Sequence, residues 1–156
     1  MCNSLKRIEE LVREQISGGS TIDELSQYLK DPDEAVRLGA VEAFEALGDG
    51  LVADDLAALY PRETSDQMKL AIITAIGSIN APPPMELLES IIADTAISDD
   101  LLEACLLAMC NCNPEGTGRV CEIEYFHVDE RYRRIAHEVG EGLMPPEMAS
   151  CPPPKE

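Results

Sequence analysis

Aromatic residues are scarce in this chain of 156 residues: tryptophan is absent, and only two phenylalanines and four tyrosines occur. A core built from alanine, leucine and isoleucine suits close helix–helix packing better than a β-sandwich or barrel. Basic residues are also few, twelve against thirty acidic ones, so the formal charge is −18. A field of that sign repels phosphate backbones and anionic lipids, which argues against nucleic acid or membrane as a partner. It favours a protein partner with a basic surface.

Long apolar runs are missing as well. No segment approaches the roughly 18–20 apolar residues that span a bilayer. The first fifteen residues, MCNSLKRIEELVREQ, are charged from Lys6 onward and lack the apolar stretch of a secretory signal. We therefore expect a cytoplasmic protein, whose six cysteines are reduced thiols or metal ligands and not a disulfide framework.

A repeat of 32–33 residues is the strongest pattern in the sequence. Its clearest copy lies in 33–48, where apolar residues at steps of 4, 3, 1 and 3 share one side of a helix. The same five places recur 32 residues later and 33 residues after that. The three sets are Val36, Ala40, Ala43, Phe44, Leu47; Met68, Ile72, Ala75, Ile76, Ile79; and Leu101, Cys105, Ala108, Met109, Cys112. A repeat of this length predicts an α-solenoid of antiparallel helix hairpins.

The expected organisation is a single all-α domain over 1–143. An amphipathic helix over 3–17, capped by Asn3 or Ser4, covers the first end of the stack. Three hairpin units follow over 20–48, 51–80 and 84–113. Asp31 or Asp33, then Ser65 or Asp66, and then a residue of Ser98-Asp99-Asp100 are expected to cap the three inner helices, because their side chains can accept from free first-turn N–H groups.

The pattern breaks after residue 113. Residues 114–128 contain two glycines and a β-leaning run, Val120 to Phe126, so we expect an irregular or extended insertion. A helix returns over 129–143, where Tyr132, Ala136, Val139 and Leu143 match the repeat again. The Pro-rich tail, 144–156, is expected to be disordered.

The stretch DPDEAVRLGAVEAFEALGD resembles the inner helix of HEAT repeats, including the lyase-type HEAT-like repeats of bacteria and archaea. The matching features are Asp31-Pro32 before the helix, Val36-Arg37 at its start, Ala40 and Ala43, and the closing Leu47-Gly48. The resemblance covers roughly residues 20–113. It implies a right-handed superhelix whose inner helices line a concave face, and a binding scaffold more often than an enzyme.

The candidate binding residues lie on the inner helices, away from the apolar stripe. An acidic strip that also carries leucines suits a basic or amphipathic partner segment, because charge steers approach and apolar contact prolongs binding. The 114–128 insertion adds aromatic surface. The predicted partner-binding residues are Glu34, Leu38, Glu42, Glu45, Leu70, Thr74, Glu103, Leu107, Tyr125 and Phe126. The competing interpretation is a solvated helix face with capping residues. We expect Arg37 and Lys69 to form an intramolecular ladder with neighbouring acids.

Two other functions remain open. The cysteine cluster over 105–121 could hold zinc or an iron–sulfur cluster, with Cys110, Cys112, Cys121 and His127 as ligands, although the spacing matches no C-x2-C knuckle. We otherwise expect no cofactor.

His127 and His137 lie among acidic residues and could act as general bases, but no nucleophile with an orienting partner is recognisable, so we expect no enzyme. The HEAT-like resemblance leaves a third possibility, an accessory to an enzyme that modifies a partner.

Overall fold

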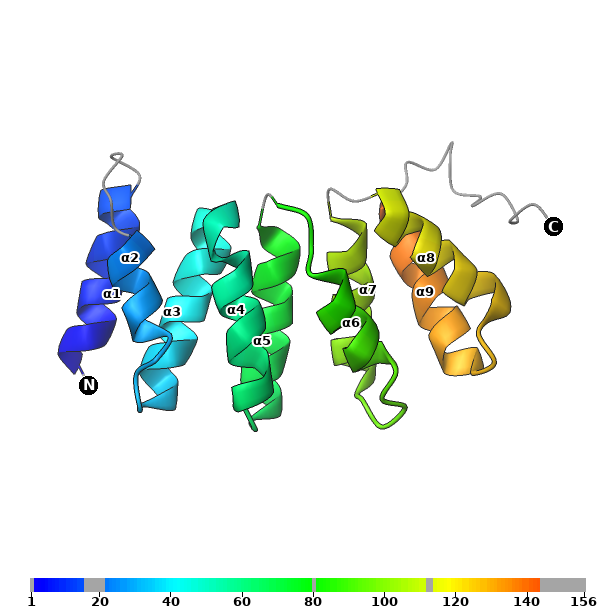
Figure 1. Cartoon of the computed structure of the whole chain (residues 1–156), viewed down its shortest axis with the longest axis horizontal. Helices are drawn as coiled ribbons and strands as arrows, with labels where there is room; N and C mark the ends of the chain where they lie inside the picture. The colour runs from blue at the N-terminus through cyan, green and yellow to red at the C-terminus, as the bar shows by residue number, and fades with distance from the viewer. Residues whose placement is uncertain (1, 16–21, 80, 112–113, 144–156) are drawn as a thin grey trace. The chain divides into compact units, whose positions relative to one another are not determined.

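The computed structural model describes residues 2–15, 22–79, 81–111 and 114–143. All regular structure in these ranges is helical, and no β-strand occurs among them (Figure 1). The predicted all-α class is therefore confirmed. None of the helices described there is long and apolar enough to cross a membrane. The chain divides into two compact units, Met1–Ala81 and Pro82–Glu156.

The first unit contains five α-helices and two short 3-10 turns in its described part. In chain order they are α1 (Cys2–Gln15), α2 (Ile22–Tyr28), α3 (Glu34–Leu47), η1 (Gly50–Val52), α4 (Ala53–Leu59), η2 (Tyr60–Arg62) and α5 (Asp66–Ser78). Helix α3 packs against both α1 and α5, while α2 packs against α3 and α4 against α5 (Figure 1). The unit thus has an inner row, α1, α3 and α5, backed by α2 and α4.

The ends of the inner helices follow the predicted capping chemistry. The Asp33 side chain caps α3 by accepting from the backbone N–H of Ala35 at 3.0 Å. The helix ends at Gly48, which has φ of +63° and donates its N–H to the Phe44 carbonyl. Glycine adopts this left-handed conformation at little cost, so the sequence stops the helix at that residue. Ser65 caps α5 in the same way, accepting from the Met68 N–H.

The repeated apolar positions form the core, as the pattern predicts. In α3 and α5 the template positions are buried, except that Leu47 is half-buried. A second buried residue beside the stripe, Val41 in α3 and Ile73 in α5, widens the packed side. Burying an apolar side chain of this size stabilises a fold by about 1.5–3 kcal/mol, so these stripes hold the inner row together.

The second unit contains four α-helices in its described part. They are α6 (Met85–Ile92), α7 (Asp99–Cys110), α8 (Pro114–Phe126) and α9 (Glu130–Leu143). Helix α7 packs against all three others, and α8 packs against α9. Ser98 caps α7, as predicted. Tyr132 of α9 is fully buried and donates its hydroxyl hydrogen bond to the Ile92 carbonyl at 2.8 Å, which ties α9 to the end of α6.

The predicted irregular insertion over 114–128 is wrong, because most of it is the helix α8. Its buried residues, Gly116, Val120 and Ile123, lie at helical steps of 4 and 3, so packing against α7 and α9 outweighs the β-leaning composition. A Cβ on Gly116 would lie 1.7 Å from the Met109 carbonyl oxygen, so this glycine allows α8 to approach the backbone of α7. Pro114 fits the first turn, where its missing N–H costs nothing.

One further prediction is wrong at the start of the chain, and two others lie outside the described residues. Helix α1 begins at Cys2, so Asn3 and Ser4 lie inside it and do not cap it. Residues 16–21, which include the end of the predicted first helix and the start of the second, lie outside the described residues, as does the tail over 144–156.

Candidate functional site

The predicted binding positions of the first unit lie on the surface of the inner row. Glu34, Glu42 and Thr74 are exposed, and Leu38 and Leu70 are half-buried. They occupy the sides of α3 and α5 opposite the core stripes, because a helix that buries one side must present the other to solvent. Glu45 is also half-buried. The structure therefore leaves all of these residues accessible to a partner.

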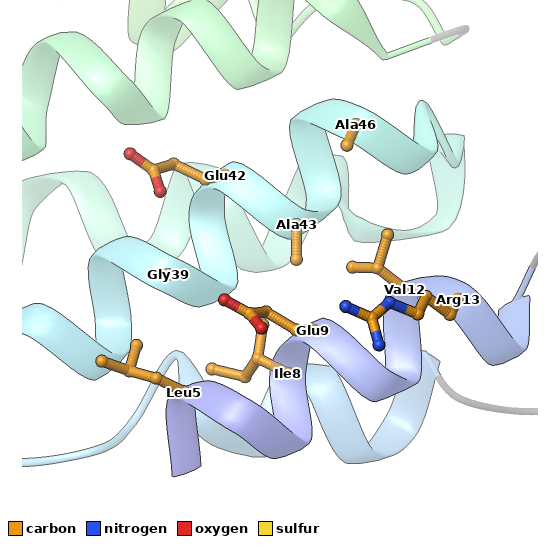
Figure 2. A pocket seen from close by; sticks show the side chains of 9 residues that line it. All are labelled: Leu5, Ile8, Glu9, Val12, Arg13, Gly39, Glu42, Ala43 and Ala46. Atoms are coloured by element: carbon orange, nitrogen blue, oxygen red, sulfur yellow. The ribbon is translucent and has the colours of Figure 1, made fainter. Parts of the chain in front are cut away.

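A groove runs between α1 and α3 on this inner row (Figure 2). Its volume is about 430 Å³, and its lining is mostly apolar. The residues that line it are Leu5, Ile8, Glu9, Val12 and Arg13 of α1, and Gly39, Glu42, Ala43 and Ala46 of α3. A concave apolar surface with a few charged groups at its edge is the usual form of a binding site.

Small residues on α3 create the groove. Ile8 and Ala43 are buried and form its floor, while Leu5 is 37% exposed at one end. A Cβ on Gly39 would lie 2.8 Å from Cδ2 of Leu5. Because Gly39 has no side chain, the Leu5 side chain can pack directly against α3. At the other end Ala46 is exposed and fills little space, which leaves the groove accessible there.

Charged side chains border the groove, and within the described residues they have no ion-pair partner. These are Glu9 and Arg13 on α1, and Glu42 on α3. Arg7, on the same helix, differs: its guanidinium binds Glu24 at 2.8 Å and also pairs with Glu10 and Glu14. The pKa of Arg7 is raised by these acids, first of all by its hydrogen bonds to Glu24. The charges of the groove are thus available to a partner, while that of Arg7 is not.

Most arginines of the chain are used within their own unit, which leaves the acidic surplus on the surface. Each of them binds a carboxylate or a backbone carbonyl: Arg7, Arg37, Arg119, Arg131, Arg133 and Arg134. The predicted internal pairing of Arg37 with a neighbouring acid is confirmed. Lys69 instead lies over the ring of Tyr60, with its amine 5.9 Å from the centroid.

The remaining predicted binding residues belong to the second unit. Glu103 and Leu107 are exposed on α7, and Tyr125 and Phe126 are exposed at the end of α8. Phe126 is 67% exposed and Val128, in the turn that follows, 94%. Together with Ile123 they line a second hollow, of about 390 Å³, next to Arg119 and Glu122. Arg119 is already bound to Glu89 at 2.7 Å, so this patch offers apolar contact with little free charge.

The predicted metal ligands do not form a site within the described residues. Cys121 is disulfide-bonded, so the expectation that all six cysteines are reduced or bind metal is wrong for this residue. His127 accepts the Asp129 N–H at Nδ1 and stacks on Tyr132 at 4.2 Å between ring centroids. Cys112 lies outside the described residues. Among those described, no three His, Cys, Asp or Glu side chains are placed to hold a metal ion.

The free thiols are poorly suited to ligation or nucleophilic attack. Burial raises the pKa of Cys105 to about 12 and also raises the pKa of Cys110. Both are therefore protonated at neutral pH, whereas metal binding and attack require the thiolate. This chemistry gives no support to a thiol function for the two residues.

A histidine–carboxylate pair occurs on the second unit. His137 Nδ1 lies 2.8 Å from Glu124, and Nε2 lies 3.4 Å from Glu141. The hydrogen bond to Glu124 raises the pKa of His137, and the charges of Glu141 and Glu138 add to the shift. The hollow around the pair is lined by Glu124, Tyr125, Glu130, Arg133, Arg134 and His137 and contains no serine, threonine or cysteine nucleophile among its described residues.

The sequence interpretation did not identify the contribution of α1 to the candidate site. Leu5 of this helix is partly exposed, and both Leu5 and Val12 line the groove. Glu9, Arg13, Gly39 and Ala46 were not singled out. Gly39, Ala43 and Ala46 place small residues on one side of α3, which is compatible with a groove there. Whether they form a groove depends on which helix packs against that side, and the sequence alone does not show this.

Comparison with known proteins finds no matching family model, no matching curated protein and no matching solved structure.

Proposed function

We propose that this chain is a HEAT-like α-solenoid that acts as a non-catalytic scaffold and binds a basic or amphipathic segment of a partner protein. The observation that carries the proposal is the recurring exposed side of α3, α5 and α7. Each presents acids or leucines at equivalent repeat positions, while the opposite side of the same helix forms the core. The two sides therefore serve different purposes, packing and contact with solvent or a partner.

The charge distribution supports the same proposal. The chain carries −18 overall, and its arginines are largely neutralised inside each unit. A basic segment is consequently attracted from a distance, since complementary fields raise association rates. Leu38 and Leu70 on the first unit then supply apolar area that slows dissociation, and Leu107 offers the same kind of contact on the second unit.

A labelled synthetic peptide of about 18 residues, with leucines at helical spacing and lysines elsewhere, tests the proposal by fluorescence anisotropy. A peptide with glutamate in place of lysine and a scrambled lysine peptide serve as controls. We expect the full chain to bind only the first peptide well, and its affinity to fall at least about tenfold between about 50 and about 300 mM salt. Equal binding of all three peptides, or no binding, contradicts the proposal.

Paired variants locate the contact. Glu42→Gln with Glu45→Gln removes two charges from the proposed side of α3, and affinity should fall by about fivefold at low salt. Asp54→Asn with Glu86→Gln removes the same charge from exposed positions on α4 and α6. These controls should bind nearly as well as the unmodified chain. A similar loss in both pairs would show a general charge effect and would count against this side of α3.

A further inference from the structure

The groove between α1 and α3 has the dimensions of a seat for a short helix. From Leu5 to Val12 its α1 border covers seven residue steps, about 10 Å or two helical turns. Figure 2 shows Leu5, Ile8 and Val12 along α1 in the same order as Gly39, Ala43 and Ala46 along α3. A partner helix with apolar residues at i, i+3 or i+4, and i+7 presents a stripe of the same length.

Charges at the edge of the groove are distributed unevenly along it. Glu9 lies beside its middle, Glu42 lies on the α3 side toward the Gly39 end, and Arg13 lies toward the Val12 and Ala46 end. None of the three has an ion-pair partner within the described residues. Most arginines of the described residues bind an acid or a carbonyl of the chain. Arg13 does not, and its side chain lines the groove instead. An occupant that complements this edge carries a cation at its centre and an anion at one end.

We infer that this groove binds one short amphipathic helix of a partner protein, with lysine or arginine opposite Glu9 and Glu42 and an acidic residue opposite Arg13. The inference rests on the proposed scaffold function and specifies where, and with which charge pattern, a partner segment is held. A second copy of the chain is disfavoured as the occupant, because each copy carries −18 and the two repel each other.

Two labelled peptides of about 14 residues probe the charge pattern. Both carry a leucine stripe and central lysines, but one has glutamates at both ends and the other has lysines there. In Arg13→Glu, the ratio of affinities should shift by about fivefold toward the lysine-ended peptide, relative to the unmodified chain. Arg62→Glu makes the same charge change at an exposed position on η2, away from the groove, and should leave the ratio almost unchanged.

A blocking variant probes the groove itself. Ala46→Trp places a large side chain in the exposed end of the groove and should weaken both peptides at least about tenfold. Ala58→Trp, at an exposed position on α4, is the matched control and should bind normally. Thermal unfolding of both variants shows whether each is folded, and a folded Ala46→Trp that does not bind supports the inference.

The outcomes separate the inference from the function on which it rests. If the unmodified chain binds the peptides and both Ala46→Trp and Arg13→Glu behave like it, the groove inference is wrong while the scaffold function stands. If the chain binds no lysine-bearing peptide at all, both fail. Analytical ultracentrifugation measures the oligomeric state of the full chain. A dimer that Ala46→Trp converts to a monomer would show that a second copy occupies the groove, and this result would overturn the inference.

Discussion

Arg37 and Glu63 form a bidentate pair that joins the start of α3 to the end of η2. Nε and Nη2 of Arg37 donate to the two carboxylate oxygens of Glu63 at 2.7 and 3.1 Å. Nη1 also donates to the carbonyls of Asp31 and Pro32, which hold the turn before α3. The Glu63 side chain is only 5% exposed, and its hydrogen bonds raise the pKa of Arg37. Both charges are thus satisfied in a site that water scarcely reaches.

Removing one member of this pair should destabilise the first unit. Glu63→Ala leaves a largely buried guanidinium without its anion, and we expect the free energy of unfolding to fall by about 2–4 kcal/mol. Glu24→Ala is the matched control, because Glu24 also binds an arginine bidentately but is 41% exposed. Its loss should cost much less stability than the loss of Glu63, because water screens an exposed ion pair. Urea unfolding followed by circular dichroism measures both, and equal losses would contradict the burial argument.

Two neighbouring glycines of α8 should respond in opposite directions to the same substitution. Gly116→Ala places a Cβ against the Met109 carbonyl, so the second unit should lose several kcal/mol of stability, about 3 or more, or fail to fold. Gly118 has no such neighbour within 4 Å of the position that a Cβ would occupy, and Gly118→Ala should stabilise α8 by up to about 1 kcal/mol. Thermal unfolding compares the two, and a stable Gly116→Ala would show that α8 does not approach α7 so closely.

A buried charge in the core stripe should collapse the inner row. Ala40 is fully buried on α3, so Ala40→Asp introduces an unpaired carboxylate at a cost of several kcal/mol, about 3–5. Ala35→Asp makes the identical change at an exposed position in the first turn of the same helix, where negative charge is favourable. Circular dichroism should show a folded Ala35→Asp and an unfolded Ala40→Asp. A folded Ala40→Asp would mean that the packing side of α3 is misassigned.

The His137 pair should make stability depend on pH in a defined direction. Because the hydrogen bond to Glu124 raises the pKa of His137 above its ordinary 6.5, the charged form is stabilised by folding. The contribution is complete below the unfolded pKa of about 6.5 and disappears as the pH rises through the higher folded pKa. His137→Gln should remove this component of the pH profile. An NMR titration of the ring that gives a pKa at or below about 6.5 would contradict the assignment.

Local interactions explain why much of the fold could be predicted from the sequence. The helix ends are set by Asp33, Ser65 and Gly48, which bind backbone groups within four residues of themselves. Where these helices start and end can therefore be predicted without knowledge of the fold. The buried stripe depends on spacing along one helix, and Ala40 and Ile72 are buried as their periodicity predicts.

The failures involve contacts between elements. The composition of α8 favours a strand, and it is helical because Gly116 and Val120 pack against other helices that the local pattern does not show. The groove depends on which side of α3 lies against α1, so Arg13 had no reason to be chosen from the sequence.

The side-chain interactions that join one element to another affect how fast the chain can fold. Arg7 and Glu24 are 17 residues apart, Arg37 and Glu63 are 26 apart, and Tyr132 and the Ile92 carbonyl are 40 apart. Each therefore closes only a short loop, at a small entropic cost. Chains whose contacts are close in sequence fold in microseconds to milliseconds, since no distant ends need to meet first. Each unit can thus begin to fold as soon as its first two or three helices have left the ribosome.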